Sequence, residues 1–186
     1  MQSRLTLIAN ASTSAARAAA FPVDEGIDEF GKSDAKALAE RLRRARVVLT
    51  SPAVRALETA GALGLEAVID EDLRDLDLGR WAGSTLAAIA EREPDAFQNW
   101  LTDPAAVPHG GESVEQLIAR TAIWLNGVLR RQENIIAITH PPVMRAAIVA
   151  AIHAGAASFW HIDIAPLSVL ELSSNGRRWT LRSLGN

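Results

Sequence analysis

The 186-residue sequence contains no cysteine and no tyrosine, and it has only two methionines. Without cysteine, the chain cannot form disulfide bonds, use a thiolate in catalysis or bind a metal through sulfur. A chain free of disulfides suits the cytoplasm, and we expect a cytoplasmic protein.

Long hydrophobic runs are also missing. The longest apolar region, 143–160, is interrupted by Arg145 and His153, so it does not read as a membrane span. The apolar run Leu5 to Ala9 is too short for the core of a secretion signal, which needs roughly 7–15 residues. The net charge is −3 and no basic cluster extends beyond 41–46, so we expect neither nucleic acid nor a membrane as a partner.

With 48% hydrophobic residues, the chain is long enough for a sizeable core and short enough for a single domain over 1–186. Apolar runs predict strands at 5–8, 46–50, 66–69 and 134–139, and helical spacing predicts helices at 33–45, 51–63, 84–92, 94–101, 113–129 and 142–154. A final hairpin, 167–173 and 178–183, turns at Asn175-Gly176. This alternation predicts a three-layer α/β/α sandwich with a mostly parallel central sheet and helices on both faces.

Ligands of such sheets bind at the carboxyl ends of the strands. Three predicted strand ends, 9–13, 50–55 and 139–145, are therefore the places to look. Arg55 follows Ser51-Pro52 in the first turn of a helix, where it suits an anion but equally suits an ordinary surface arginine. His140 stands between a strand and a helix, where a packed core histidine is an equally good interpretation.

Taken in order, five segments resemble motifs of the histidine phosphatase superfamily, which has the phosphoglycerate mutase-like fold. They are Leu-Ile-Ala-Asn-Ala-Ser-Thr (7–13), Ser-Pro-Ala-Val-Arg-Ala-Leu-Glu-Thr-Ala (51–60), Leu-Arg-Asp-Leu-Asp-Leu-Gly-Arg-Trp-Ala-Gly (73–83), Gly-Gly-Glu-Ser (110–113) and Ile-Thr-His (138–140). The resemblance implies that Arg55 and His140 bind a phosphoryl group. It places Asp75 where the family has its acidic glutamate, one methylene longer.

The first strand end departs from the family motif Arg-His-Gly-Glu-Thr. Asn10 stands at the position of the nucleophilic histidine, and an amide nitrogen is no nucleophile. Ala9 replaces an arginine that would clamp phosphate, and Ala11 replaces a glycine, so a positive φ there would be strained. Pro141 and Pro142 follow His140 and cannot donate backbone N–H groups to an anion.

From these departures we expect a degenerate member of the superfamily, a pseudoenzyme without phosphohistidine-based phosphatase or mutase activity. We expect it to bind a small inorganic anion or phosphorylated ligand through Arg55, His140, Asn10 and Arg145. Arg145 is the lone charge of an apolar helix, and an ion pair is the other interpretation of it.

Two alternatives stay open. In the first, the chain is an active phosphomonoester hydrolase, or another enzyme, that uses His140 as nucleophile or base, with Asp75 as its partner. In that case His140 could also activate Ser12 or Thr13. In the second, the chain is a scaffold or interaction subunit with a vestigial pocket, with interface anchors among Trp81, Trp100 and Trp160.

We predict no metal and no organic cofactor. The four histidines, at 109, 140, 153 and 161, form no ligand-spaced pair with a carboxylate, and the sequence has no glycine-rich phosphate loop. The segment 83–111 is expected to cover the pocket as a lid, and its sequence names no substrate. The oligomeric state is left open.

Overall fold

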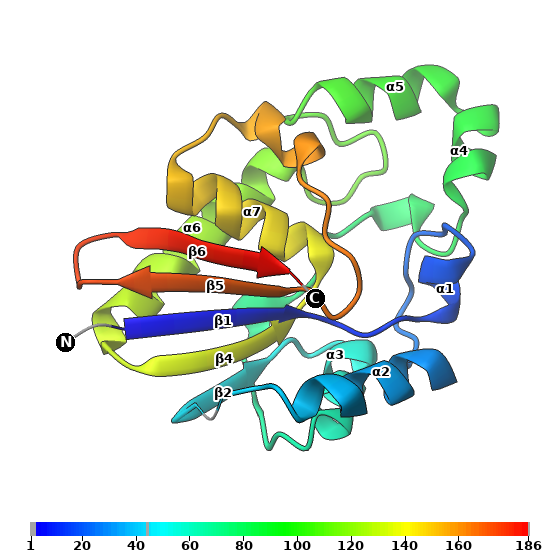
Figure 1. Ribbon diagram of the computed structural model, residues 1–186. Coiled ribbons are helices and arrows are strands. Elements are labelled where there is room, and N and C mark those ends of the chain that lie inside the picture. Colours follow the sequence, from blue (N-terminus) through cyan, green and yellow to red (C-terminus); the bar gives the residue numbers. More distant parts are fainter. Residues whose placement is uncertain (1–2, 44, 186) are drawn as a thin grey trace.

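The fold was analysed in a computed structural model, which describes residues 3–43 and 45–185. Its centre is a six-stranded sheet with the order β3-β2-β4-β1-β5-β6 (Figure 1). The pairs β3 with β2, β2 with β4, and β4 with β1 are parallel, whereas β5 and β6 run antiparallel at one edge. The mostly parallel sheet with an antiparallel end confirms the predicted α/β fold class.

The strands follow the apolar runs of the sequence. They are β1 (Ser3–Ala9), β2 (Val47–Thr50), β3 (Val68–Ile69), β4 (Asn134–Thr139), β5 (Val169–Ser174) and β6 (Trp179–Gly185). In β4, Ile135 and Ala137 pack on one face of the sheet, and Ile136 and Ile138 pack on the other. A strand that is buried on both faces needs such an unbroken apolar run, as expected for the centre of a parallel sheet.

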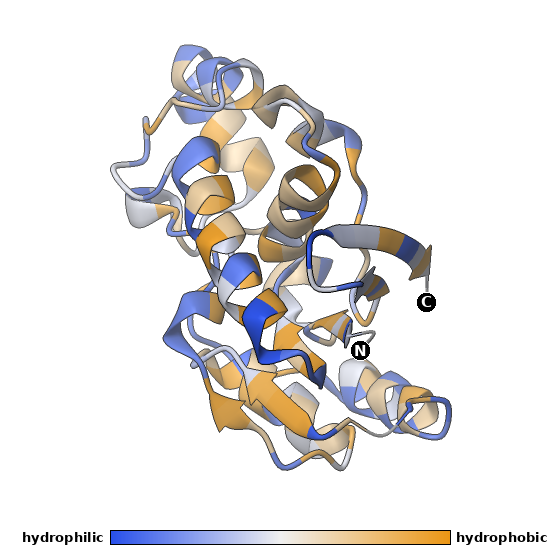
Figure 2. Ribbon diagram, turned by 90° about the vertical axis from the view of Figure 1, so that its left-hand side faces the viewer, coloured by the Kyte–Doolittle hydropathy of each residue, from blue (hydrophilic) through white to orange (hydrophobic). Residues whose placement is uncertain are grey.

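Two pairs of helices cover the sheet. On one face, α6 (Val114–Arg131) and α7 (Pro141–Ile152) bury apolar residues against β1, β4 and β5. On the other face lie α2 (Glu29–Ala39) and α3 (Val54–Ala62). The strands between these layers are largely hydrophobic (Figure 2). This arrangement confirms the predicted helices on both faces.

A third group of apolar side chains lies beyond the carboxyl ends of the parallel strands. It joins α4 (Leu86–Arg92), α5 (Pro94–Thr102) and the 3-10 turns η2 (Gly79–Trp81) and η3 (Ala156–His161) to α6 and α7. Trp81 and Trp100 are buried in it, with their ring centroids 5.7 Å apart. These two tryptophans therefore pack inside the molecule.

Within the described ranges, no helix is long and apolar enough to cross a membrane.

Several element ends differ from the predictions. The helix after β2 starts at Val54 with Ala53 as its N-cap residue, and not at Ser51-Pro52. The helix α2 starts four residues earlier than predicted, because the Asp28 side chain accepts a hydrogen bond from the Gly31 amide. The short helix α1 (Ser14–Arg17) and the 3-10 turn η1 (Glu71–Leu73) were not predicted. The capping box of Ser113 and Gln116 is confirmed at the start of α6.

Two glycines allow the segment 77–79 at the start of η2 to touch the loop 109–111 that precedes α6. A Cβ atom at Gly111 would collide with the Asp77 carbonyl, and one at Gly79 would collide with the His109 carbonyl. Gly79 also has a φ of +46°, which side chains disfavour. This close approach fixes the segment that begins with Asp75.

We expect Gly111→Ala to lower the free energy of unfolding by about 1–3 kcal/mol, the usual cost of overpacking. Gly127→Ala is the matched control, because a Cβ atom there meets nothing within 4 Å in the middle of α6. The control should be stabilised by about 1 kcal/mol through its higher helix propensity. Urea denaturation measures both changes, and equal stabilisation by the two substitutions would contradict the close approach.

Candidate active site

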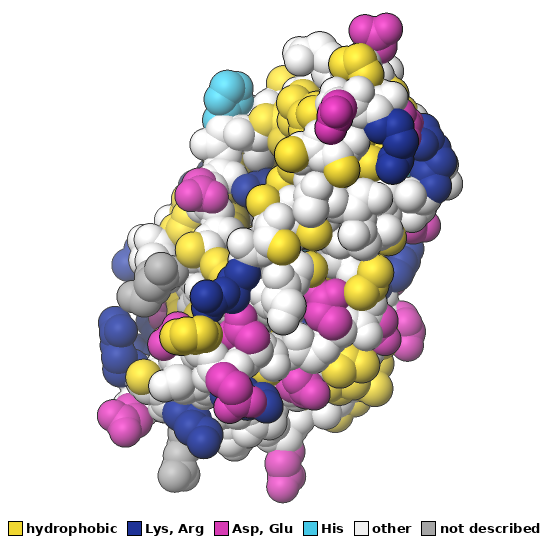
Figure 3. Space-filling model, turned by 90° about the vertical axis from the view of Figure 1, so that its right-hand side faces the viewer, with side chains coloured by type: hydrophobic (Ala, Val, Ile, Leu, Met, Phe, Trp, Pro, Cys, Tyr) yellow, Lys and Arg dark blue, Asp and Glu magenta, His cyan; other side chains and the backbone are white. Residues whose placement is uncertain are grey.

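The candidate site lies at the carboxyl ends of the parallel strands, on the side of the molecule that carries α1, α4 and α5 (Figure 1). Figure 3 looks onto this side, where hydrophobic side chains gather in its upper part beside acidic and basic groups. A cavity of about 390 Å³ opens here. Its polar lining comes from Asn10, Thr13, Arg55, Asp75 and Arg145, which different elements supply.

His140 directly follows β4 and is fully buried behind this lining. Its Nδ1 lies 3.0 Å from the Asn10 Oδ1, and its Nε2 lies 2.7 Å from the Ser51 Oγ. The Asn10 amide nitrogen donates to the Ala11 carbonyl at 2.9 Å, so the amide oxygen faces the imidazole and must accept. His140 therefore donates from Nδ1 and accepts the Ser51 hydroxyl proton at Nε2.

Burial lowers the pKa of His140 from 6.5 to about 4, because the charged imidazolium loses its hydration. The carboxylate of Asp75, whose Oδ2 is 3.5 Å from Nδ1, opposes this shift without cancelling it. The imidazole is neutral at pH 7 and is able to accept a proton, as a base requires.

Arg55 and Asp75 form a buried ion pair beside His140. The Nη2 of Arg55 donates to the Asp75 Oδ2 at 2.7 Å, and its Nη1 donates to the Val23 carbonyl at 2.9 Å. Exposed fractions of 7% and 14% place both side chains at the wall of the cavity. The first turn of α3 thus brings a cation, and the loop after η1 brings a carboxylate, to the same point.

Arg120 holds the loop that carries Asp75. From α6, its guanidinium donates to the backbone carbonyls of Asp72, Arg74 and Asp75 at 2.9–3.0 Å. Glu112 orients it through contacts of 2.6 and 2.9 Å. The Gly-Gly-Glu-Ser motif at 110–113 therefore supplies the carboxylate that positions Arg120, and the position of Asp75 depends on this pair.

The replaced residues of the first strand end fit their surroundings. Ala9 is fully buried in the core between the sheet and α7. The Ala11 amide donates to the Thr59 Oγ1 at 2.9 Å, and Ala11 has no positive φ, so the strain considered for that position is absent. The backbone after β1 is thus held by α3 without the family's glycine.

The hydroxyl beside His140 is not one of those predicted. Ser12 Oγ donates to Asp28 at 2.9 Å, and Thr13 Oγ1 accepts from the Ala16 amide as the N-cap of α1. Ser51, which the sequence presented as a helix cap, is the serine that bonds to His140. The available signal was its position at the end of β2: because β2 is a neighbour of β4, the residues that follow the two strands lie close together.

Arg145 lies one turn into α7 and also lines the cavity. Its nearest carboxylate oxygen, on the almost fully exposed Asp163, is 3.9 Å away. Its guanidinium lies over the Phe159 ring, 5.6 Å from the centroid. Arg145 therefore faces the aromatic part of the cavity, and its role as a phosphate ligand stays a prediction.

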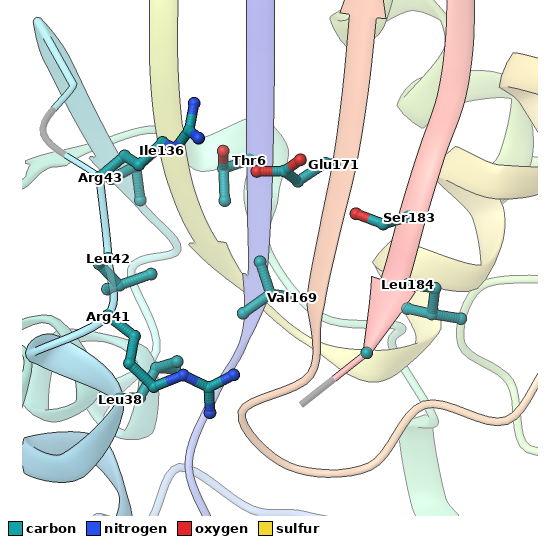
Figure 4. A pocket seen from close by; sticks show the side chains of 11 residues that line it. Thr6, Leu38, Arg41, Leu42, Arg43, Ile136, Val169, Glu171, Ser183 and Leu184 are labelled. Carbon is teal, nitrogen blue, oxygen red and sulfur yellow. The ribbon is translucent and has the colours of Figure 1, made fainter.

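A second cavity, of about 350 Å³, lies on the face of the sheet that carries α2. Figure 4 shows Arg41 and Arg43 near Thr6, Val169 and Glu171, which point outward from the strands. None of the residues that match the family motifs lines it. The candidate active site is thus the cavity at the strand ends.

The fold and the site together define a class of protein. The family sequence model of the histidine phosphatase superfamily (branch 1) matches residues 11–186 of the chain. The chain belongs to the histidine phosphatase superfamily, as its motifs predicted.

Particular relatives carry names of activities. A bifunctional protein of Mycobacterium tuberculosis is 32% identical over 162 residues, which are 81% of this chain and 44% of that protein. The chain thus spans less than half of that relative. Phosphoserine phosphatase 1 of Hydrogenobacter thermophilus is 32% identical over 161 residues, covering 81% of this chain and 76% of the enzyme.

The structure is similar to that of mycobacterial glucosyl-3-phosphoglycerate phosphatase in complex with VO3. The TM-score is 0.86 with 27% identity, and the alignment covers 96% of each chain. The same phosphatase has been solved with inorganic phosphate, at a TM-score of 0.83 and 25% identity over 98% of this chain and 97% of that chain. That phosphatase has thus been solved in complex with two small oxyanions.

These relatives correct the main functional expectation. The expected pseudoenzyme, derived from Asn10 and Ala9, is wrong, because the relatives are named as phosphatases of phosphoserine and of glucosyl-3-phosphoglycerate. The findings favour the alternative of an active phosphomonoester hydrolase. The departures at Ala9, Asn10, Ala11 and Pro141-Pro142 were too narrow a basis, and the alternative that assigned His140 and Asp75 to catalysis is the one that the relatives favour.

The neutral state of His140 predicts a pH-dependent stability. Its folded-state pKa of about 4 lies below the ordinary value of 6.5, so its contribution is complete above pH 6.5 and is lost as the pH falls toward 4. Between pH 7 and pH 5, we expect the free energy of unfolding to fall by about 2 kcal/mol more in the wild type than in His140→Gln. Urea denaturation at the two pH values measures this, and parallel losses would contradict a buried neutral imidazole.

Breaking the pair that holds the Asp75 loop should destabilise the protein strongly. Arg120→Met leaves Glu112 buried without its partner, and we expect the free energy of unfolding to fall by about 3–5 kcal/mol. Lys32→Met removes the exposed pair with Glu29 and should cost much less. Thermal unfolding compares the variants. A similar loss in both would show that Arg120 is an ordinary surface arginine.

Proposed function

We propose that this chain is a phosphomonoester hydrolase that acts on a small phosphorylated molecule, with His140 as the base in place of the absent histidine nucleophile. The observation that carries the proposal is the row of groups Ser51, His140 and Asp75 beside the Arg55 guanidinium. Ser51 is hydrogen-bonded to the His140 Nε2, and the Asp75 carboxylate lies 3.5 Å from its Nδ1. The phosphatases among the relatives support the reaction class. The single-domain organisation and cytoplasmic location stay predictions.

Arg55 supplies the positive charge for the phosphoryl oxygens. Its Nη2 donates to Asp75. A phosphate dianion at the cavity wall would compete with Asp75 for the N–H donors of Arg55 in a charge-assisted contact. The Asn10 amide adds a neutral polar group at the end of β1. Without the arginine of the family motif, we expect a weaker phosphate site, by roughly one charged hydrogen bond or about 1.5–3 kcal/mol.

The attacking group in this proposal is water, because Asn10 cannot attack phosphorus. Ser51 also lines a hollow of about 360 Å³ that shares Arg55 and Asp75 with the main cavity, and the proposal places the attacking water in this hollow. As the water oxygen bonds to phosphorus, its proton moves to the Ser51 Oγ, and the Ser51 proton moves to the His140 Nε2. No phosphoenzyme forms.

The leaving group needs one proton, and the same row delivers it. In the proposed step, the Nδ1 proton of His140 leaves its hydrogen bond with the Asn10 Oδ1 and moves to the Asp75 Oδ2, which lies 3.5 Å from Nδ1. Asp75 gives it to the ester oxygen as the bond between phosphorus and oxygen breaks. The products are the free alcohol and inorganic phosphate. His140 is left protonated at Nε2 instead of Nδ1, so before the next turnover the Nε2 proton returns through Ser51 to product or water while Nδ1 takes up a proton from water.

Turnover of p-nitrophenyl phosphate, phosphoserine and 3-phosphoglycerate by the purified chain tests the proposal. We expect phosphate release, and a loss of about 10²- to 10⁴-fold in kcat for His140→Ala, the usual contribution of a general base. His153→Asn is the matched control, because this exposed histidine ends α7 in a left-handed conformation that asparagine tolerates.

The control variant should keep the wild-type rate. Absence of turnover on all three substrates would overturn the proposal, as would a rate that survives His140→Ala. A phosphorylated protein detected by mass spectrometry during turnover would contradict direct attack by water.

A further inference from the structure

The part of the cavity beyond Arg55 and Asp75 is mainly apolar and aromatic. Its walls come from the loop after α1, the loop after η1, the segment 83–111 and η3. They comprise Phe21, Leu76, Leu78, Leu86, Trp100, Leu101, Phe159 and Trp160. The Trp100 and Trp160 rings meet edge to face at 4.5 Å. A volume of about 390 Å³ suits a small organic molecule, and this lining suits an apolar or aromatic body.

Arg145 is the one guanidinium of the described residues that stands within this aromatic part. Its side chain is 24% exposed, and its Nε is buried without a hydrogen-bond partner. Among residues 3–43 and 45–185, the one acidic group paired with it is Asp163, 3.9 Å away and 99% exposed, where solvent screens the attraction. Arg145 is therefore a cation whose burial is not matched by a buried anion.

Burial lowers the pKa of the Arg145 guanidinium from its usual value, and Asp163 only partly opposes this. The direction agrees with the geometry, since loss of hydration exceeds the attraction of the nearby carboxylate. The indole N–H groups of Trp100 and Trp160 also lack partners. Buried N–H groups without partners therefore gather in the walls of this end of the cavity.

Arg145 is separate from the groups proposed to handle phosphate. Arg55, Asp75 and His140 contact one another, and the charged groups that act on His140 are Asp75, Arg55, Arg120 and Asp24. Arg145 lies five residues after His140, a rise of about 7.5 Å along a helix, and it contacts Phe159 instead. The two cations can therefore bind two different groups of one molecule.

We propose that Arg145 binds a carboxylate at the far end of the substrate, so that the substrate class is a phosphate monoester with an apolar or aromatic body and a second acidic group. This inference rests on the proposed function for the phosphate end. A guanidinium matches a carboxylate with two parallel hydrogen bonds, and a bound carboxylate would replace the distant Asp163. The aromatic walls would cover the body between the two charges.

The test measures binding and not turnover, so it does not depend on the proposed chemistry. Calorimetry compares benzylphosphonate, 4-carboxybenzylphosphonate and the uncharged isostere 4-carbamoylbenzylphosphonate, none of which has a phosphate ester to hydrolyse. In the wild type we expect the carboxylate to bind about 10- to 100-fold more tightly than the other two, as one charged hydrogen-bonding group implies.

Arg145→Met should reduce this ratio to about one, and Arg145→Lys should keep part of it because the charge remains. Arg182→Met, on the exposed edge strand β6, is the matched control and should keep the full ratio. The circular dichroism of each variant verifies its fold.

Three results would overturn the inference. They are equal binding of all three phosphonates by the wild type, equal binding of the carboxylate and the amide, and an equal loss of affinity for every ligand in Arg145→Met. The last result would make Arg145 a ligand of the phosphoryl group. A retained carboxylate preference in a chain that hydrolyses nothing supports the inference and overturns the proposed function.

Discussion

The ion pair between Arg55 and Asp75 is the interaction on which the site depends. Both side chains are nearly buried, and a lone buried charge at this position would be costly. The pair joins α3 to the loop after η1 and brings a carboxylate within 3.5 Å of the buried His140. Arg120, oriented by Glu112, fixes the backbone of that loop. The geometry at His140 thus follows from two charge pairs, 55 with 75 and 112 with 120, which lie in different parts of the sequence.

The same interactions order the site around Asn10, which stands where the family motif predicts the nucleophilic histidine. Asn10 accepts from the His140 Nδ1 and so directs the Nε2 lone pair toward Ser51. Burial keeps the imidazole neutral, which leaves it able to accept a proton at physiological pH. In this account, the residue that replaces the nucleophile sets the tautomer of the remaining histidine.

The sequence predicted the sheet, its helices and the family, because buried parallel strands and helix caps leave local patterns such as the run at 134–139 and the capping box at Ser113. Asn10, Arg55, Asp75 and His140 were found through motif positions, and the structure brings them together. Ser51 and Arg120 were missed as site residues, because their partners lie 89 and 45 residues away and no local pattern marks such contacts. The predicted pseudoenzyme was wrong because it was inferred from replaced motif residues alone, and the named phosphatases among the relatives favour the alternative that uses His140 and Asp75.

A crystal structure of the chain with vanadate would test the central claim most directly, since this anion occupies a related phosphatase. The account predicts vanadate in the strand-end cavity, in contact with the Arg55 guanidinium and within hydrogen-bonding reach of Asp75. Vanadate that binds elsewhere, or a cavity that stays free of it at saturating concentration, would contradict the claim that these residues form a phosphate site.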